Sequence, residues 1–89
     1  MPHLLVRHRV SDFTRWKSVY DDHESARDAA GLKFLHLWCN EDVSDEVFIL
    51  FETTDVAKAK ELIGSEDLKQ SMQASGVQGV PDIVFLTEK

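Results

Sequence analysis

The sequence has few of the residues that mark secreted, membrane-bound or nucleic-acid-binding proteins. Cys39 is its one cysteine, so no disulfide can form within the chain, which suits a reducing cytoplasm. Ten Lys and Arg residues stand against sixteen Asp and Glu, for a formal net charge of -6. This deficit of basic charge opposes binding to nucleic acid or to an anionic membrane, because phosphate contacts require a basic surface.

Long hydrophobic runs are also absent. Arg7 interrupts the apolar stretch of the N-terminal segment MPHLLVRHRV, so we expect neither a signal peptide nor a membrane-spanning segment. The hydrophobic fraction of 43% is typical of a globular protein and too high for a disordered one. A chain of 89 residues predicts one domain over 1–89, small enough for oligomerisation to add useful core.

The sequence lacks recognisable metal and phosphate motifs. On a strand, His3 and His8 are five apart and His36 and Cys39 three apart, so each pair points to opposite faces. The segment SGVQGVP has neither the lysine nor the following helix of a phosphate-binding loop. We therefore expect no metal site and no phosphate-binding loop.

Hydrophobic periodicity predicts the order β-α-β-β-α-β. Runs of apolar and β-branched residues predict strands at 3–10, 33–39, 47–52 and 82–88. Helical spacing and capping residues predict one helix between Asp12 and Gly31, and helical segments at 56–63 and 66–75. The segment VQGVP, 77–81, is expected to be a loop.

Two right-handed crossovers would place strands 3–10 and 47–52 at the centre of the sheet. The sequence thus predicts a ferredoxin-like α+β fold: an antiparallel four-stranded sheet with both helices on one face. The strands, however, are apolar on both faces: Val47 and Ile49 lie on one, Phe48 and Leu50 on the other. We expect a homodimer in which the uncovered faces of two sheets pack together.

Three segments carry a resemblance to a known group of proteins. VRHRVSDFTRWKSVYD, VFILFETTDVAKAKELI and SEDLKQSMQASGVQGVPDIVFL resemble small bacterial members of the dimeric α+β barrel superfamily, which includes antibiotic biosynthesis monooxygenase-like and polyketide cyclase-like proteins. The resemblance implies a small hydrophobic ligand, and in some members oxidation of polycyclic aromatics without a cofactor. Haem-degrading members use an Asn, Trp and His set that this sequence does not match, so no cofactor is expected.

His8 and His36 are the candidate catalytic residues, because imidazole exchanges protons near neutral pH. His8 is either a general base or ligand-binding group, or a structural histidine bonded to the backbone or to a carboxylate such as Asp12. His36 lies beside Trp38 on its strand, with Phe34 expected on the same face. That pair would suit a flat apolar ligand or fill the dimer interface, where aromatic residues are enriched.

The candidate ligand-binding residues are Trp16, Tyr20, Trp38 and Arg7. Trp16 and Tyr20 belong to the apolar stripe of the first helix, where they serve the core or line a pocket between helix and sheet. If Val6 and His8 face the helices, Arg7 and Arg9 face the partner sheet. There they could pair with Glu52 or another carboxylate, bind an anionic ligand, or extend to solvent.

Two functions remain open at this stage. The first is binding or conversion of a small hydrophobic or aromatic molecule, by monooxygenase- or cyclase-like chemistry without a cofactor. The alternative is a non-catalytic structural or interaction dimer with no small-molecule substrate. A cavity that holds a histidine with a perturbed pKa and a convergent polar group would favour the first.

Overall fold

The computed structural model describes residues 2–89, apart from the side chain of Val80. Its strands are β1 (His3–Val10), β2 (Leu32–Cys39), β3 (Glu46–Thr53) and β4 (Val77–Leu86). They form one antiparallel sheet in the order β2-β3-β1-β4. The predicted ferredoxin-like α+β fold is confirmed, with β1 and β3 at the centre of the sheet.

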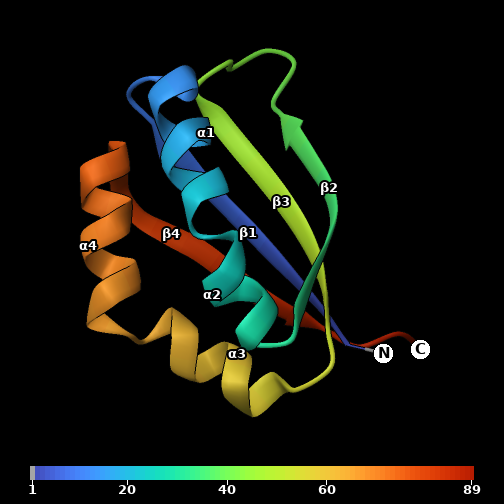
Figure 1. Cartoon of the computed structure of the whole chain (residues 1–89). Coiled ribbons are helices and arrows are strands. Elements are labelled where there is room, and N and C mark those ends of the chain that lie inside the picture. Colours follow the sequence, from blue (N-terminus) through green and yellow to red (C-terminus); the bar gives the residue numbers. More distant parts are fainter. Residues whose placement is uncertain (1) are drawn as a thin grey trace.

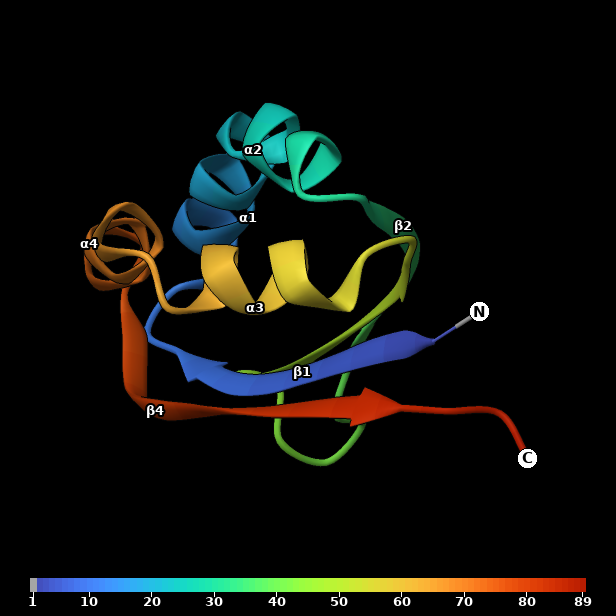
Figure 2. The ribbon, with the colours of Figure 1, turned by 90° about the horizontal axis from the view of Figure 1, so that it is seen from below.

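All the helices lie on one face of this sheet, and the other face is open (Figures 1 and 2). They are α1 (Phe13–Asp22), α2 (Glu24–Ala29), α3 (Val56–Ile63) and α4 (Glu66–Ser75). Three begin at residues whose side chains accept backbone N–H bonds: Asp12 before α1, Asp55 before α3 and Ser65 before α4. No helix within residues 2–89 is long and apolar enough to cross a membrane.

The single helix expected between Asp12 and Gly31 is wrong, because the chain breaks it at His23 into α1 and α2. The carbonyl of Tyr20 accepts the guanidinium of Arg27 at 2.7 Å and the N–H of His23 at 3.2 Å. Both bonds tighten the chain where a continuous helix would bond that carbonyl to residue 24. The break turns α2 toward the end of the sheet where β2 begins (Figure 2).

The loop expected at 77–81 is also wrong, because β4 already begins at Val77, which pairs with Val10 of β1. Gly76 makes this early start possible: its φ of 85° reverses the chain directly after α4, and an added Cβ would clash with the side chain of Ser11. The irregular part of the segment becomes a bulge. Between the pairs Arg7–Asp82 and Arg9–Gln78, residues 79–81 stand opposite one residue, His8.

Alternation along β1 separates its two kinds of side chain. Leu4, Val6, His8 and Val10 are buried beneath the helices, while Arg7 and Arg9 are exposed on the open face. Trp16, Leu32, Val47, Ile49, Phe51 and Ala59 complete the buried core. In this central strand, His8 thus faces the helices, and Arg7 and Arg9 face the open side.

The same alternation fails in β2, where the register with β3 shifts between Phe34 and His36. Phe34 stands opposite Phe51, whose side chain is buried under the helices, and their rings lie 6.5 Å apart edge to face. His36 stands opposite Leu50 on the open face. The expectation that Phe34 shares a face with His36 and Trp38 is wrong, because the extra residue at the bulge reverses the alternation.

Candidate functional site

A cavity of about 80 Å³ lies between the sheet and the helices. Residues from every strand of the sheet and from α1, α2, α3 and α4 form its walls, which are overwhelmingly apolar. Three of the six candidate residues line it, namely His8, Trp16 and Tyr20. The cavity also meets polar side chains that were not among the candidates, His23, Arg27, Ser71 and Ser75.

His8 is the buried polar group at the floor of this cavity. His8 is only 6% exposed, and neither its Nδ1 nor its Nε2 has a hydrogen-bond partner. Desolvation by burial lowers its pKa from 6.5 to about 4, so the imidazole is neutral at pH 7. The alternative of a structural histidine bonded to the backbone or to a carboxylate such as Asp12 is wrong, because neither ring nitrogen has a partner and Asp12 accepts the N–H groups of Thr14 and Arg15.

Tyr20 brings a second unpartnered polar group to the same wall. Its Oη is buried without a hydrogen-bond partner, and burial raises the pKa of the phenol. Trp16 lies between the two, with its ring 5.3 Å from that of His8 and 4.9 Å from that of Tyr20. A donor or acceptor entering the cavity would meet His8 and Tyr20 with their hydrogen-bonding capacity unused.

Two of the four polar residues that sequence reasoning passed over follow a pattern that the sequence shows. His23 and Arg27 belong to the same helical stripe as Trp16 and Tyr20, and this spacing was the signal that could have identified them. Ser71 comes from α4, and its Oγ lies 3.2 Å from Nδ1 of His23. No sequence pattern links residues 23 and 71, because only the packing of α4 against α1 brings them together.

The other three candidates, His36, Trp38 and Arg7, lie on the open face of the sheet. The rings of His36 and Trp38 stack at 4.9 Å, and Trp38 is 48% exposed. His36 therefore cannot share a substrate with His8 within one copy of the chain, because the sheet separates them. The six candidates form two groups, of which only the His8 group lines a cavity under the helices.

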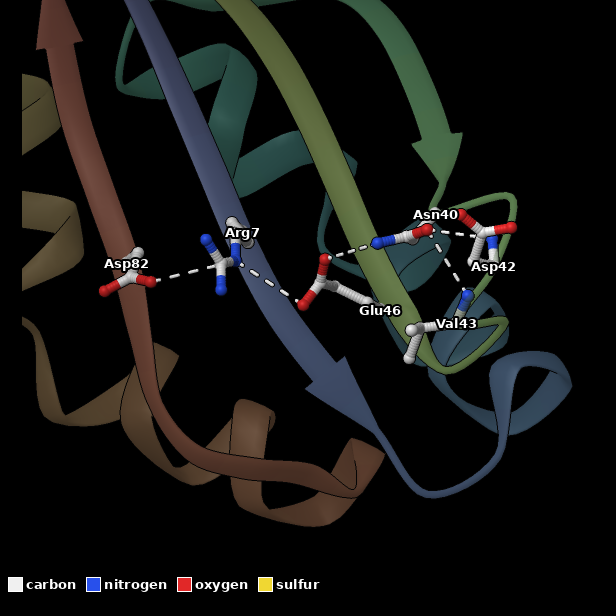
Figure 3. Close-up of polar contacts among 6 residues, drawn as sticks. All are labelled: Arg7, Asn40, Asp42, Val43, Glu46 and Asp82. Carbon is white, nitrogen blue, oxygen red and sulfur yellow. Dashed lines mark hydrogen bonds and ion pairs between the residues drawn. The ribbon is translucent and has the colours of Figure 1, made fainter.

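Arg7 joins a chain of polar contacts across the open face (Figure 3). Its Nε lies 3.5 Å from the Glu46 carboxylate and 3.9 Å from that of Asp82. Glu46 also accepts a hydrogen bond from Asn40 at 3.0 Å, and Asn40 in turn caps the turn between β2 and β3. The carboxylate partners are thus Glu46 and Asp82 rather than Glu52, which stands opposite His3 at the far end of β1.

Apolar side chains occupy much of the remaining open face. Trp38, Val84 and Leu86 are each more than two-fifths exposed, and Phe48, Leu50 and Leu5 are half-buried beside them. Within residues 2–89, no three His, Cys, Asp or Glu side chains gather in an arrangement that would hold a metal ion. The open face has the character of a contact surface.

No family model matches the chain, and no curated protein matches it in sequence. Solved structures do match its fold. An antibiotic biosynthesis monooxygenase superposes with a TM-score of 0.70 at 10% identity, over 100% of this chain and 99% of the other. SnoaB, a cofactor-independent oxygenase from Streptomyces nogalater, gives 0.69 at 14% identity over 99% and 92%. Rv0793 from Mycobacterium tuberculosis gives 0.67 at 11% identity over 100% and 96%.

These similarities, together with the sheet order and the one-sided helices, define the class of fold. The chain has the α+β fold of the antibiotic biosynthesis monooxygenase-like proteins. The resemblance seen in the sequence is thereby confirmed for the fold. At these levels of identity the similarity concerns the fold, and chemistry has to be argued from the cavity itself.

Proposed function

We propose that the protein binds a small aromatic or hydrophobic molecule in the cavity under its helices and oxidises it without a cofactor, with His8 as the proton acceptor. The observation that carries this proposal is the pair of unpartnered polar groups, His8 and the Oη of Tyr20, in one apolar cavity. Leaving a buried polar group unpaired costs about 1–3 kcal/mol, so a native fold seldom retains two beside each other without a use.

The environment of His8 suits a base that must be neutral before it acts. With its pKa lowered to about 4, the imidazole is unprotonated at pH 7 and can accept a hydrogen bond or a proton from a ligand hydroxyl. Trp16 fixes the ring from one side. Tyr20 offers a hydroxyl that can donate to oxygen on the ligand.

The proposed reaction takes dioxygen as its oxidant. For a 1,4-dihydroxynaphthalene, a ring hydroxyl gives its proton to His8 and the electron-rich anion reduces O₂. A new C–O bond forms at the adjacent ring carbon and the O–O bond breaks. The diol and O₂ thus become a hydroxynaphthoquinone and one water. SnoaB, which shares this fold, is a cofactor-independent oxygenase, and that supports the reaction class.

The size of the cavity limits what can enter without rearrangement. A cavity of about 150 Å³ accommodates benzene, whereas this one measures about 80 Å³. Met72 lines it from α4, and methionine adapts its shape with little strain. A single ring therefore requires Met72 to move, and a larger substrate also requires α4 to shift.

Binding can be tested with phenol as the probe. We expect phenol to shift the ring NMR signals of His8 and to leave those of His36 unchanged. His8→Leu should weaken binding about tenfold, because a buried hydrogen bond contributes about 1–1.5 kcal/mol. His36→Leu is the matched control and should bind as the wild type does. Equal affinity of both variants would remove His8 from the site.

Turnover can be tested with 1,4-dihydroxynaphthalene in air. Oxygen uptake above the uncatalysed rate, with hydroxynaphthoquinone as product and no hydrogen peroxide, would support the reaction. His8→Leu should lose this excess uptake and His36→Leu should keep it. Phenol binding without any excess uptake in the wild type would favour the alternative of a binding protein without catalysis.

We further propose that the open face pairs with that of a second copy to give a homodimer, in the cytoplasm where Cys39 stays reduced. Trp38, Val84 and Leu86 supply exposed apolar area, and burying it is favourable at about 25 cal/mol per Å² before association costs. Light scattering should give twice the mass of one chain. Leu50→Asp should halve that mass, and a monomeric wild type would refute the arrangement.

A further inference from the structure

The cavity does not end at its apolar walls. Tyr20, Arg27 and Leu32 line both the cavity and a surface groove of about 640 Å³ between α1, α2 and β2. They therefore form the boundary between the interior and this groove. Of these three residues, only Arg27 carries a charge. Its positive charge favours a ligand with a negatively charged group at this boundary.

Arg27 is held in a defined position at this boundary. Its guanidinium lies 3.7 Å from the centre of the Tyr20 ring, and its Nη1 donates to the Tyr20 carbonyl at 2.7 Å. One of the five guanidinium N–H groups is thereby used, and no carboxylate of residues 2–89 forms an ion pair with it. A fixed and partly buried cation with donors to spare is suited to an anion.

The groups around Arg27 narrow the choice of anion. Lys17 also lines the groove, but Asp21 holds its ammonium at 2.6 Å. Glu24 and Asp28 line the groove as well and repel a highly charged ligand. A single carboxylate directed at the guanidinium therefore fits better than a phosphate.

Four side chains in contact form a continuous wall along the cavity: His8, Trp16, Tyr20 and Arg27. The ring of Trp16 contacts His8 on one side and stacks on Tyr20 on the other, and Arg27 covers the Tyr20 ring. A proton acceptor stands at one end of this wall and a cation at the other. A ligand lying along it would carry its acidic group at the Arg27 end and its reacting group at the His8 end.

We propose that the cavity takes a small aromatic or hydrophobic monocarboxylic acid, whose carboxylate binds Arg27 at the boundary while its apolar part enters the cavity. This inference rests on the proposed function, because it names the substrate class of the same site. It makes Arg27 a specificity-determining residue. His8 keeps its role as the base.

Benzoate and benzamide test the proposal, since they match in shape and differ in charge. Titrations of the protein followed by NMR should show that benzoate binds at least about tenfold tighter than benzamide, because hydrogen bonds between charged groups are stronger than those between neutral ones. Arg27→Gln should abolish this preference, so that benzoate binds no tighter than benzamide. Arg27→Lys, which keeps the charge, should retain part of the preference. Arg15→Gln removes the same charge from an exposed site on α1 and should change neither affinity.

The possible results distinguish failure of the Arg27 assignment from failure of the proposed function. Equal affinity for benzoate and benzamide in the wild type, or a preference that survives in Arg27→Gln, overturns the assignment of Arg27. If phenol still shifts the His8 signals in that case, the proposed function stands and only the acid is wrong. If neither phenol nor benzoate nor benzamide moves the His8 signals, both proposals fail together.

Discussion

Replacing His8 with leucine should make the protein more stable, which is unusual for a change in a buried core. Leucine has about the volume of histidine but no polar atoms to desolvate. Both imidazole nitrogens are buried without partners in the native fold. Removing them should raise the free energy of unfolding at pH 7 by about 1–3 kcal/mol, the usual cost of an unsatisfied buried polar group. Loss of the ring contact with Trp16 offsets part of this gain.

Acid should widen the difference between the two proteins. The pKa of His8 is about 4 in the folded chain and 6.5 when it is unfolded, so between these values the unfolded state binds more protons. Wild-type stability is therefore fully present above pH 6.5 and falls as the pH approaches 4. Between pH 6.5 and pH 4, protonation of His8 should lower the free energy of unfolding of the wild type by about 3 kcal/mol, at 1.36 kcal/mol per pKa unit. The His8→Leu variant has no imidazole and should not show this loss.

Urea unfolding of both proteins at pH 7, 6, 5 and 4 measures the effect. The difference between them isolates His8, because every carboxylate is common to both. His36→Leu serves as a control on the open face and should keep the wild-type dependence on pH. A difference between wild type and His8→Leu that stays constant from pH 7 to 4 would refute the reasoning, since it would mean that the imidazole is solvated or paired.

Three further substitutions test how the fold is held. Gly76→Ala should cost about 1–2 kcal/mol of unfolding free energy, because its φ of 85° penalises any Cβ; an unchanged urea midpoint would contradict this. Ser65→Ala should cost about 1 kcal/mol by removing the cap of α4, whereas Ser18→Ala, on the exposed surface of α1, should cost less than half as much. Arg7→Met should cost about 1–3 kcal/mol of unfolding free energy, because the Glu46 side chain is only 10% exposed and loses its cation. Thermal unfolding at pH 7 measures this, and an unchanged midpoint would mean that the hydrogen bond from Asn40 alone stabilises the Glu46 carboxylate.

Strand alternation predicted much of this arrangement correctly. Val6, His8 and Val10 share one face of β1 and Arg7 and Arg9 the other, which is what a period of two requires. Because the helices can cover only one face, the more apolar set had to lie beneath them. The sequence thus predicted that His8 and the two arginines lie on opposite faces of β1, but it left open which face His8 takes, and the packing of the helices decides this.

The bulges could not be predicted in the same way. One extra residue near Leu35 puts Phe34 and His36 on opposite faces of the sheet, although alternation predicts that they share one. Nothing in the local sequence marks where this extra residue falls. A second bulge places residues 79–81 opposite His8. In each case the pairing of a whole strand decides the register, and a single residue decides the face.

The sequence by itself determined the order of elements, the central position of β1 and β3, and the presence of apolar residues on both faces of the sheet. These follow from local periodicity and from the handedness of crossovers, which act within short stretches of chain. Only the tertiary structure decided that His8 and Tyr20 meet in one cavity with their polar atoms unpaired, while His36 lies across the sheet. Burial and hydrogen-bond satisfaction depend on every element packed around a group, and so they exist only once the chain has folded.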